Sequence, residues 1–215
     1  MKCIILAAGY ATRLYAVDEF VVVSNHKFVT HFTDWAAGRT ETVRVLDDGT
    51  VSNETRLGAV RDILLAVETL ALDDDLLVIA GDNVLDFSLR HFVRYCRAQG
   101  TSCIMRYWEP SVVRLRKTGV VTVDGDGLIL SMVEKPAEPQ SHWCCPPFYF
   151  YRRSDVPLVK VGIDSGCGVD APGSFIAWLS AQTPVHAWEM PGHRFDIGNL
   201  ASYDQVQRTY KGIVL

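Results

Sequence analysis

The sequence lacks the cysteine and histidine spacings that mark metal sites, disulfide frameworks and catalytic triads. Its six cysteines contain no C-x-x-C pair, and the adjacent Cys144 and Cys145 suit neither an unstrained disulfide nor a zinc site. The six histidines are scattered, without a partner at triad-like or metal-like spacing. We therefore expect reduced thiols, a cytoplasmic protein, and histidines with structural or surface roles.

Excess charge and long apolar runs are also missing. A net charge of −4 over 215 residues argues against a broad binding surface for nucleic acid or anionic lipid. No apolar run approaches the length of a membrane span, and the run at residues 3–8 is shorter than the apolar region of a signal peptide. We expect no nucleic-acid or membrane partner, and a single domain over residues 1–215.

The first half of the chain alternates strand and helix patterns. Continuous apolar runs at residues 2–8, 20–24 and 76–80 predict strands buried on both faces of a parallel sheet. Apolar residues at helical spacing predict helices at 53–70, with Ser52 or Asn53 as N-cap, and at 87–99, with Gly100 as the stop. This alternation favours an α/β fold of Rossmann-like type, with a mixed, mostly parallel sheet flanked by helices.

The second half has a different pattern. Short strands are predicted at residues 103–108, 119–123, 128–133 and 148–152, because each run is bounded by turn residues. A helix is expected at 173–180, and a last strand near Phe195. These strands are expected to surround a ligand site next to the first half.

One loop in the first half suits a phosphate group. Residues 6–14 end a strand and open into small residues that carry a single arginine, Arg13. Small residues let backbone N–H groups approach phosphate oxygens, and a guanidinium adds a fixed positive charge. An ordinary turn with a surface arginine explains the loop equally well. A dinucleotide site is disfavoured, because Ala11 and Leu14 stand where the G-x-G-x-x-G pattern needs glycine.

Two carboxylates follow predicted strands. Asp82 comes at the carboxyl end of the 76–80 strand, where open α/β sheets place their ligands, and Asp196 follows Phe195. A carboxylate at such a position can hold Mg²⁺ against a triphosphate. Taken singly, each is more often a turn or capping residue. The pair is more persuasive than either residue alone.

Four stretches in this order resemble the sugar-nucleotide pyrophosphorylases, of which glucose-1-phosphate thymidylyltransferase is the best-known type. They are the N-terminal signature at 1–14, Gly81-Asp82-Asn83, Val133-Glu134-Lys135-Pro136 and Phe195-Asp196-Ile197-Gly198. Gly119-Val120 is similar to the family's Gly-Val pair. The chain departs from the family at Ala11, at Thr118, where a tyrosine is usual, and at Asn199. The resemblance extends from Met1 to about Tyr203.

The resemblance implies a nucleotidyltransferase that forms an NDP-sugar and pyrophosphate from an NTP and a sugar 1-phosphate, with Mg²⁺ as cofactor. Residues 1–100 would form the nucleotide-binding half and residues 101–215 the sugar-binding half. Catalysis would depend on Arg13, Asp82 and Lys135, and the metal on Asp82 and Asp196. The sugar phosphate would contact Gly119, Glu134 and Lys135. The expected nucleotide contacts are Leu6, Ala8, Gly9, Arg13, Asn53 and Gly58.

Other interpretations stay open. Asn53 with its neighbours serves equally well as a helix cap, and Glu134-Lys135-Pro136 by itself is a common surface turn. A non-catalytic homologue that binds sugar nucleotides is one rival function. A cytidylyltransferase for a non-sugar phosphate such as phosphocholine is another. A homo-oligomer is possible, and neither the base nor the sugar can be named.

The connection after the N-terminal signature is short. Tyr15 and Ala16 lead almost directly into the second strand, whereas a parallel crossover needs roughly a dozen residues or more. The family's Pro-Lys stretch is absent too. Either the protein carries a mobile segment between Tyr15 and Ala16 that the printed sequence omits, or the segment is deleted. We favour the first, since deletion would remove a crossover helix.

Intact mass distinguishes the two explanations. A protein that carries the extra segment should exceed the 24.0 kDa of the 215 residues. Mass spectrometry of the purified natural protein measures this directly, and a mass near 24.0 kDa would contradict our choice.

Overall fold

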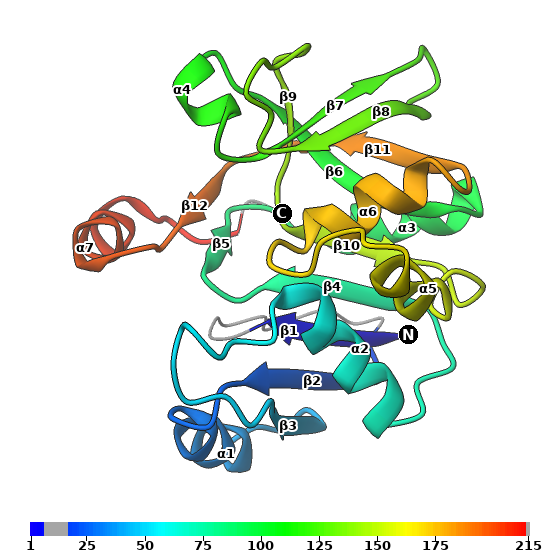
Figure 1. Cartoon of the computed structure of the whole chain (residues 1–215). Helices are drawn as coiled ribbons and strands as arrows, with labels where there is room; N and C mark the ends of the chain where they lie inside the picture. Colours follow the sequence, from blue (N-terminus) through cyan, green and yellow to red (C-terminus); the bar gives the residue numbers. More distant parts are fainter. Residues whose placement is uncertain (7–16, 214–215) are drawn as a thin grey trace.

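The computed structural model describes residues 1–6 and 17–213, and its centre is one large mixed sheet (Figure 1). The strand order is β3-β2-β1-β4-β10-β6-β9-β7-β8, and β11 pairs with β6 beside this path. A separate two-stranded sheet joins β5 (Asn83–Leu85) to β12 (Arg194–Asp196). The predicted α/β fold with a mixed sheet and flanking helices is confirmed. Within the described ranges no helix combines the length and apolar character needed to cross a membrane.

The first half supplies the parallel part of the sheet. β1 (Lys2–Leu6) lies between β2 (Glu19–Ser24) and β4 (Leu76–Ala80), and β3 (Val43–Asp47) adds to the outer side of β2. All these pairs are parallel. Most residues of β1, β2 and β4 are buried, as continuous apolar runs predict for strands covered on both faces.

The second half supplies mainly antiparallel strands. β10 (Phe148–Tyr151) pairs antiparallel with β4 and with β6 (Ser102–Trp108), and so joins the two halves. β9 (Trp143–Cys145), β7 (Gly119–Val123) and β8 (Ile129–Glu134) continue the sheet, again antiparallel. β11 (Val185–Glu189) is parallel to β6.

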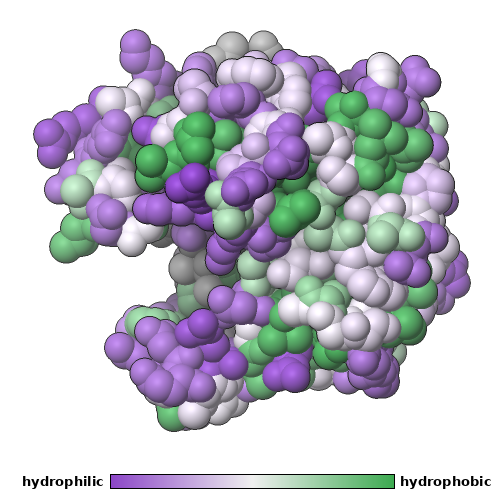
Figure 2. Space-filling model, turned by 45° about the horizontal axis from the view of Figure 1, so that its top comes forward, coloured by the Kyte–Doolittle hydropathy of each residue, from purple (hydrophilic) through white to green (hydrophobic). Residues whose placement is uncertain are grey.

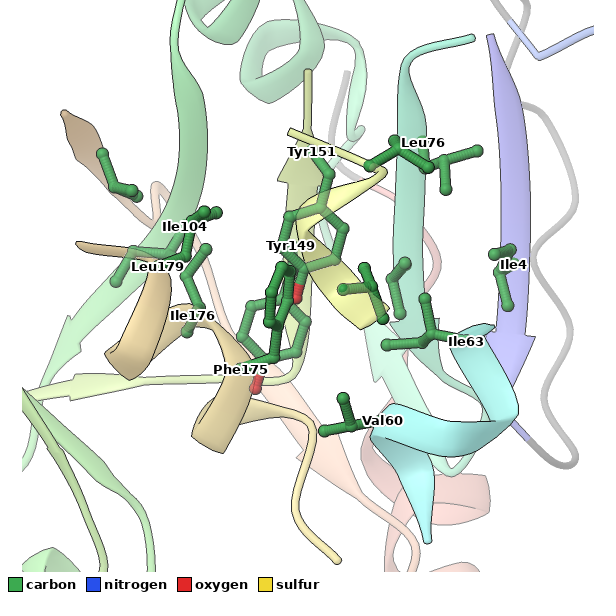
Figure 3. Close-up of a cluster of buried hydrophobic side chains, with 14 of the residues drawn as sticks. Ile4, Val60, Ile63, Leu76, Ile104, Tyr149, Tyr151, Phe175, Ile176 and Leu179 are labelled. Atoms are coloured by element: carbon green, nitrogen blue, oxygen red, sulfur yellow. The ribbon is translucent and has the colours of Figure 1, made fainter. Parts of the chain in front are cut away.

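Alternate residues of the central strands face two separate cores. In β1, Ile4 faces the core under helices α2, α5 and α6, whereas Cys3 and Ile5 face the core under α1 and α3. Figure 3 shows side chains of α2 and α6 packed toward the strands in the first core, around Tyr149 and Tyr151. The bounds of the five helices are α1 (Val29–Ala37), α2 (Ala59–Thr69), α3 (Arg90–Gln99), α5 (Leu158–Asp164) and α6 (Gly173–Ser180).

The helix predicted at residues 173–180 is confirmed at both ends as α6, whereas the helices predicted at 53–70 and 87–99 begin later than predicted. α2 begins at Ala59 with Gly58 as N-cap, so the predicted caps Ser52 and Asn53 are wrong. Residues 52–55 form a separate turn, in which the Thr55 N–H donates to the Ser52 carbonyl. α3 begins at Arg90 and ends, as predicted, at a left-handed Gly100.

Several elements were not predicted: α1, β3, β5, β9, α4 (Val112–Leu115), α5 and α7 (Leu200–Thr209). Most of them are short or amphipathic only in part. α1, for example, has no fully buried residue and contacts the core through partly buried side chains such as Phe32 and Trp35.

Asp62 on α2 supplies a stability prediction with a defined pH dependence. Its Oδ1 atom is buried and has no hydrogen-bond partner in the part of the chain that the structure describes. Burial, and to a lesser degree the nearby Asp48, raises the pKa of Asp62 to about 7 from 3.8. Between these values the folded state holds a proton that the unfolded state has lost, so this group lowers the stability as the pH rises.

The substitution Asp62→Asn should therefore raise the free energy of unfolding by roughly 1–3 kcal/mol at pH 8, with a smaller gain at pH 5. Urea denaturation at the two pH values measures the difference. Asp34→Asn, an exposed carboxylate on α1, is the matched control and should change neither value. A gain that is equal at both pH values would contradict the assignment.

Candidate active site

The two predicted metal carboxylates lie together. Asp82 directly precedes β5, and Asp196 ends β12, where it pairs with Asn83 in the antiparallel register. The Ile197 N–H donates to the Asp82 carbonyl oxygen at 2.8 Å, which fastens the two strand ends to one another. Partial burial, followed by the like charge of Asp196, raises the pKa of Asp82. The structure thus brings both carboxylates to the same point from positions far apart in the sequence.

Arg194 organises the surroundings of this pair, and sequence reasoning missed it. Its Nη1 atom donates to Asn83 Oδ1 at 2.5 Å and lies 3.6 Å from Asp196 Oδ2. Its guanidinium also lies 5.7 Å from the centroid of the Tyr107 ring. The only hint in the sequence is that Arg194 stands two positions before Asp196, the aspartate of the family motif. Its role depends on the β5–β12 pairing, which no local pattern reveals.

Asp86 holds the loop before β12. Its two carboxylate oxygens accept from the His193 backbone N–H at 2.7 Å and from His193 Nδ1 at 2.8 Å. Gly192 is required beside this contact, because a Cβ there would lie 2.4 Å from Asp86 Oδ1. These contacts fix the loop to the end of β5. They also fix the position at which β12, with Arg194 and Asp196, begins.

Glu134 is held between two glycines. Gly119 on β7 is its direct partner in the β7–β8 register. A Cβ at Gly119 would lie 3.0 Å from Glu134 Oε2, and one at Gly173 would lie 2.2 Å from the same atom. Burial raises the pKa of the Glu134 carboxyl, and Lys135 opposes that shift. The Gly-Val and Glu-Lys-Pro motifs thus contact one another through Gly119 and Glu134. Gly173 also contacts Glu134, which the sequence did not predict.

Lys135 has a left-handed backbone. Its φ of 49° is unusual for a residue with a side chain and costs on the order of 1–2 kcal/mol. The Lys135 N–H donates to the Thr118 carbonyl at 3.1 Å, which ties the turn to β7. A lysine kept where glycine would be less strained points to a use for its side chain.

Gly58 lies where nucleotide contacts were predicted, and its surroundings are structural. With φ at 93° and a position against Val169, whose carbonyl oxygen would lie 2.5 Å from an added Cβ, it admits no side chain. Arg56 Nε donates to Asp170 Oδ1 at 2.7 Å and Nη1 donates to the Asn53 carbonyl at 3.1 Å. Arg56, and more weakly Lys135, lowers the pKa of Asp170, so this loop lies near the predicted sugar-phosphate lysine.

The N-terminal signature is only partly within the described residues. Leu6 ends β1, and its carbonyl accepts the Gly81 N–H at 3.0 Å, directly beside the strand end that carries Asp82. Ala8, Gly9 and Arg13 lie outside the described residues, so their predicted contacts stay predictions. Figure 2 shows a deep notch between the part that carries α7 and the part that carries α1, and β1 and β2 point their carboxyl ends toward that side in Figure 1.

A cavity of about 640 Å³ lies beside the predicted metal carboxylates. Asp196, Arg194 and Thr118 are among the residues that line it. Thr118 immediately precedes Gly119, and its Oγ1 donates to the Cys145 carbonyl at 3.3 Å. The cavity therefore adjoins Asp196 and is large enough for a small-molecule ligand, while Glu134 and Lys135 are not among its lining residues.

The carboxylate pair has the chemistry of a magnesium site. Mg²⁺ is commonly bound by one or two carboxylates, with waters and substrate phosphates completing its shell. Asp82 and Asp196 fit this pattern, although each also has a polar neighbour, since Asn83 Nδ2 donates to Asp82 Oδ1 at 2.5 Å. No cluster of three or more His, Cys, Asp or Glu side chains suited to a metal occurs among residues 1–6 and 17–213.

Several known proteins align with nearly the whole chain. Two Streptomyces proteins named glucose-1-phosphate thymidylyltransferase align with 97% of it, that of S. antibioticus at 25% identity and that of S. griseus at 26%. The chain spans 66% and 65% of their lengths, just under two thirds. A UTP–glucose-1-phosphate uridylyltransferase of Haloferax volcanii is 26% identical over 97% of this chain and 96% of its own. The S. antibioticus alignment covers 236 positions, more than the 215 residues here.

Solved structures show the same fold. A Bacillus anthracis structure, assigned as a glucose-1-phosphate thymidylyltransferase in complex with sucrose, superposes with a TM-score of 0.74 at 18% identity, over 100% of this chain and 96% of that one. A UDP-glucose pyrophosphorylase in complex with UDP-glucose gives 0.73 at 15% identity, over 97% of each chain. The family model described as nucleotidyl transferase matches residues 16–211. The resemblance seen in the motifs is confirmed, and the chain belongs to the nucleotidyl transferase family.

Proposed function

We propose that this protein transfers a nucleotidyl group from an NTP to a sugar 1-phosphate, releasing pyrophosphate. A phosphate oxygen of the sugar 1-phosphate forms a bond to the α-phosphorus, and the bond from that phosphorus to the pyrophosphate oxygen breaks. The observation that carries the proposal is the meeting of Asp82 and Asp196 at the paired ends of β5 and β12, beside a cavity that Asp196 lines. Phosphoryl chemistry of this kind depends on positioning and on charge neutralisation.

Each site residue has a separate role in this proposal. Asp82 and Asp196 would hold Mg²⁺, which neutralises developing charge on the phosphates when it is bound. Lys135 offers an ammonium to the sugar phosphate from a turn tied to Thr118. Glu134, fixed between Gly119 and Gly173, accepts hydrogen bonds from sugar hydroxyls. Arg13 and the loop around it bind the triphosphate.

The relatives suggest which substrates to try first. Three of those compared are named for glucose 1-phosphate, with thymidylyl or uridylyl transfer. We therefore propose a glucose-1-phosphate thymidylyltransferase-like activity, with UTP as the nearest alternative donor. Pyrophosphate release over a panel of NTPs and sugar 1-phosphates tests the activity. Binding without turnover would favour a non-catalytic homologue, and a preference for choline phosphate would overturn the assignment of a sugar.

Removing either carboxylate should abolish most of the activity. Asp82→Asn and Asp196→Asn keep the size of the side chain and remove its charge, so kcat/KM should fall by about 100-fold or more and the Mg²⁺ concentration for half-maximal rate should rise. Steady-state pyrophosphate release across a Mg²⁺ titration measures both quantities. Asp204→Asn on α7, an exposed carboxylate, is the control and should behave as the unmodified protein. An unchanged Mg²⁺ dependence in both variants would exclude a metal role for the pair.

Substitution of Gly173, the first residue of α6, should change the KM for the sugar 1-phosphate alone. In Gly173→Ala the new Cβ displaces the Glu134 carboxylate, so KM for the sugar 1-phosphate should rise about 10-fold while KM for the NTP stays the same. Gly125→Ala introduces the same methyl group into open space and should change neither constant. Equal increases in both KM values would show a general distortion instead.

A further inference from the structure

Arg194 lies on the same face of β12 as Asp196. Side chains alternate along a strand, so residues 194 and 196 share one face and Phe195 takes the other, where its ring packs edge to face against Tyr210 with centroids 6.0 Å apart. The β5–β12 register pairs Asp196 with Asn83, the residue that follows Asp82. The strand pairing therefore brings a permanent positive charge next to both predicted metal ligands.

The Arg194 guanidinium reaches both carboxylates through one nitrogen atom. Its Nη1 atom lies 3.6 Å from Asp196 Oδ2 and donates to Asn83 Oδ1 at 2.5 Å. Because the Asn83 oxygen accepts from Arg194, the amide nitrogen faces the other way, and it donates to Asp82 Oδ1 at 2.5 Å. One oxygen of each carboxylate is thus engaged. A carboxylate held in this way can still bind a cation through its other oxygen.

The Arg194 side chain is held by protein groups and is little exposed to a ligand. It is 18% exposed, whereas Arg114, which lines the same cavity, is 76% exposed. The Arg194 guanidinium also lies 5.7 Å from the centroid of the Tyr107 ring on β6. A planar guanidinium between a ring, an amide and a carboxylate has few alternative conformations. This position suits the support of neighbouring side chains better than the capture of a phosphate.

We propose that Arg194 is a positioning residue, which orients Asp82 through the Asn83 amide and Asp196 directly, and so prepares the pair to bind Mg²⁺. The inference rests on the proposed function, which assigns the metal to these two carboxylates.

Two effects of Arg194 on the metal oppose each other. Its charge repels a nearby cation, and the order that it imposes on the ligands favours binding. Asp196 is exposed, so water and salt weaken the repulsion, whereas they do not weaken the effect of ligand orientation. Replacement of a residue that orients metal ligands typically lowers metal affinity by about 10–100-fold. We therefore expect the loss of Arg194 to weaken metal binding.

Direct binding of Mn²⁺ to the whole chain at physiological ionic strength, followed by electron paramagnetic resonance without substrates, tests the proposal apart from turnover. Arg194→Met removes the donor and the charge while keeping a long side chain, so the dissociation constant should rise about 10-fold or more. Arg194→Lys keeps one nitrogen donor, which is all that both contacts use, and should bind Mn²⁺ clearly more tightly than Arg194→Met.

A double-mutant cycle tests the link through Asn83. Asn83→Ala should also weaken Mn²⁺ binding, and the double variant Asn83→Ala with Arg194→Met should lose clearly less affinity than the product of the two single losses, because both changes remove the same link. Arg114→Met is the control. It removes a positive charge from the same cavity without touching the pair, and should leave the dissociation constant unchanged.

The outcomes separate the inference from the proposed function. Unchanged or tighter Mn²⁺ binding in Arg194→Met, an Arg194→Lys protein that binds no better than Arg194→Met, or independent losses in the double-mutant cycle each overturn the inference. Pyrophosphate release by the unmodified protein, measured separately, then leaves the proposed function in place. An unmodified protein that binds no Mn²⁺ at millimolar concentration overturns the inference together with the metal role of the pair. Absence of turnover with any sugar 1-phosphate overturns the proposed function.

Discussion

The position of β10 between β4 and β6 holds the molecule together. β10 comes from the second half of the chain, yet it pairs with a strand of the first half along Phe148–Tyr151 and places side chains in both cores. The Ala80 N–H donates to the Pro147 carbonyl at 3.1 Å, which continues the pairing to the point where β4 ends. Asp82 follows two residues later. The pairing of β10 with β4 therefore fixes the carboxyl end of β4, and with it Asp82, relative to the second half of the chain.

The site depends on close backbone approach more than on side-chain length. Glycine at positions 119 and 173 leaves room for the Glu134 carboxylate, and Gly192 leaves room for Asp86. In each case a carboxylate is held against a backbone that has no Cβ, so its position is set by main-chain geometry. Side chains with few alternative conformations lose less entropy when a ligand binds. These glycines also join elements that are distant in the sequence, since β7, β8 and α6 meet at Glu134.

Charge in the site is compensated locally. Asp196 has Arg194, Asp170 has Arg56, and Glu109 has Arg114. The Arg56–Asp170 pair is exposed on both sides, and such pairs contribute little to stability, with typical values of about 0–1 kcal/mol. Their effect is to orient each carboxylate, and in the case of Asp170 to bring a negative charge near Lys135. The arginines in this way offset the negative charge of the carboxylates, which would otherwise repel phosphate groups.

The sequence alone determined the class of fold, the order of most strands along the chain and the pairing of motifs with a family. Two-sided burial requires continuous apolar runs, so β1, β2 and β4 could be predicted directly. Gly100 predicted the end of α3, because glycine readily adopts the left-handed conformation that commonly ends a helix. The tertiary structure decided which residues of these segments contact one another. Arg194 and Gly173 acquire their roles through contacts across large sequence separations, and the start of α2 is set by packing of Gly58 on Val169. Local periodicity carries no record of such contacts, because each of them depends on which strands become neighbours.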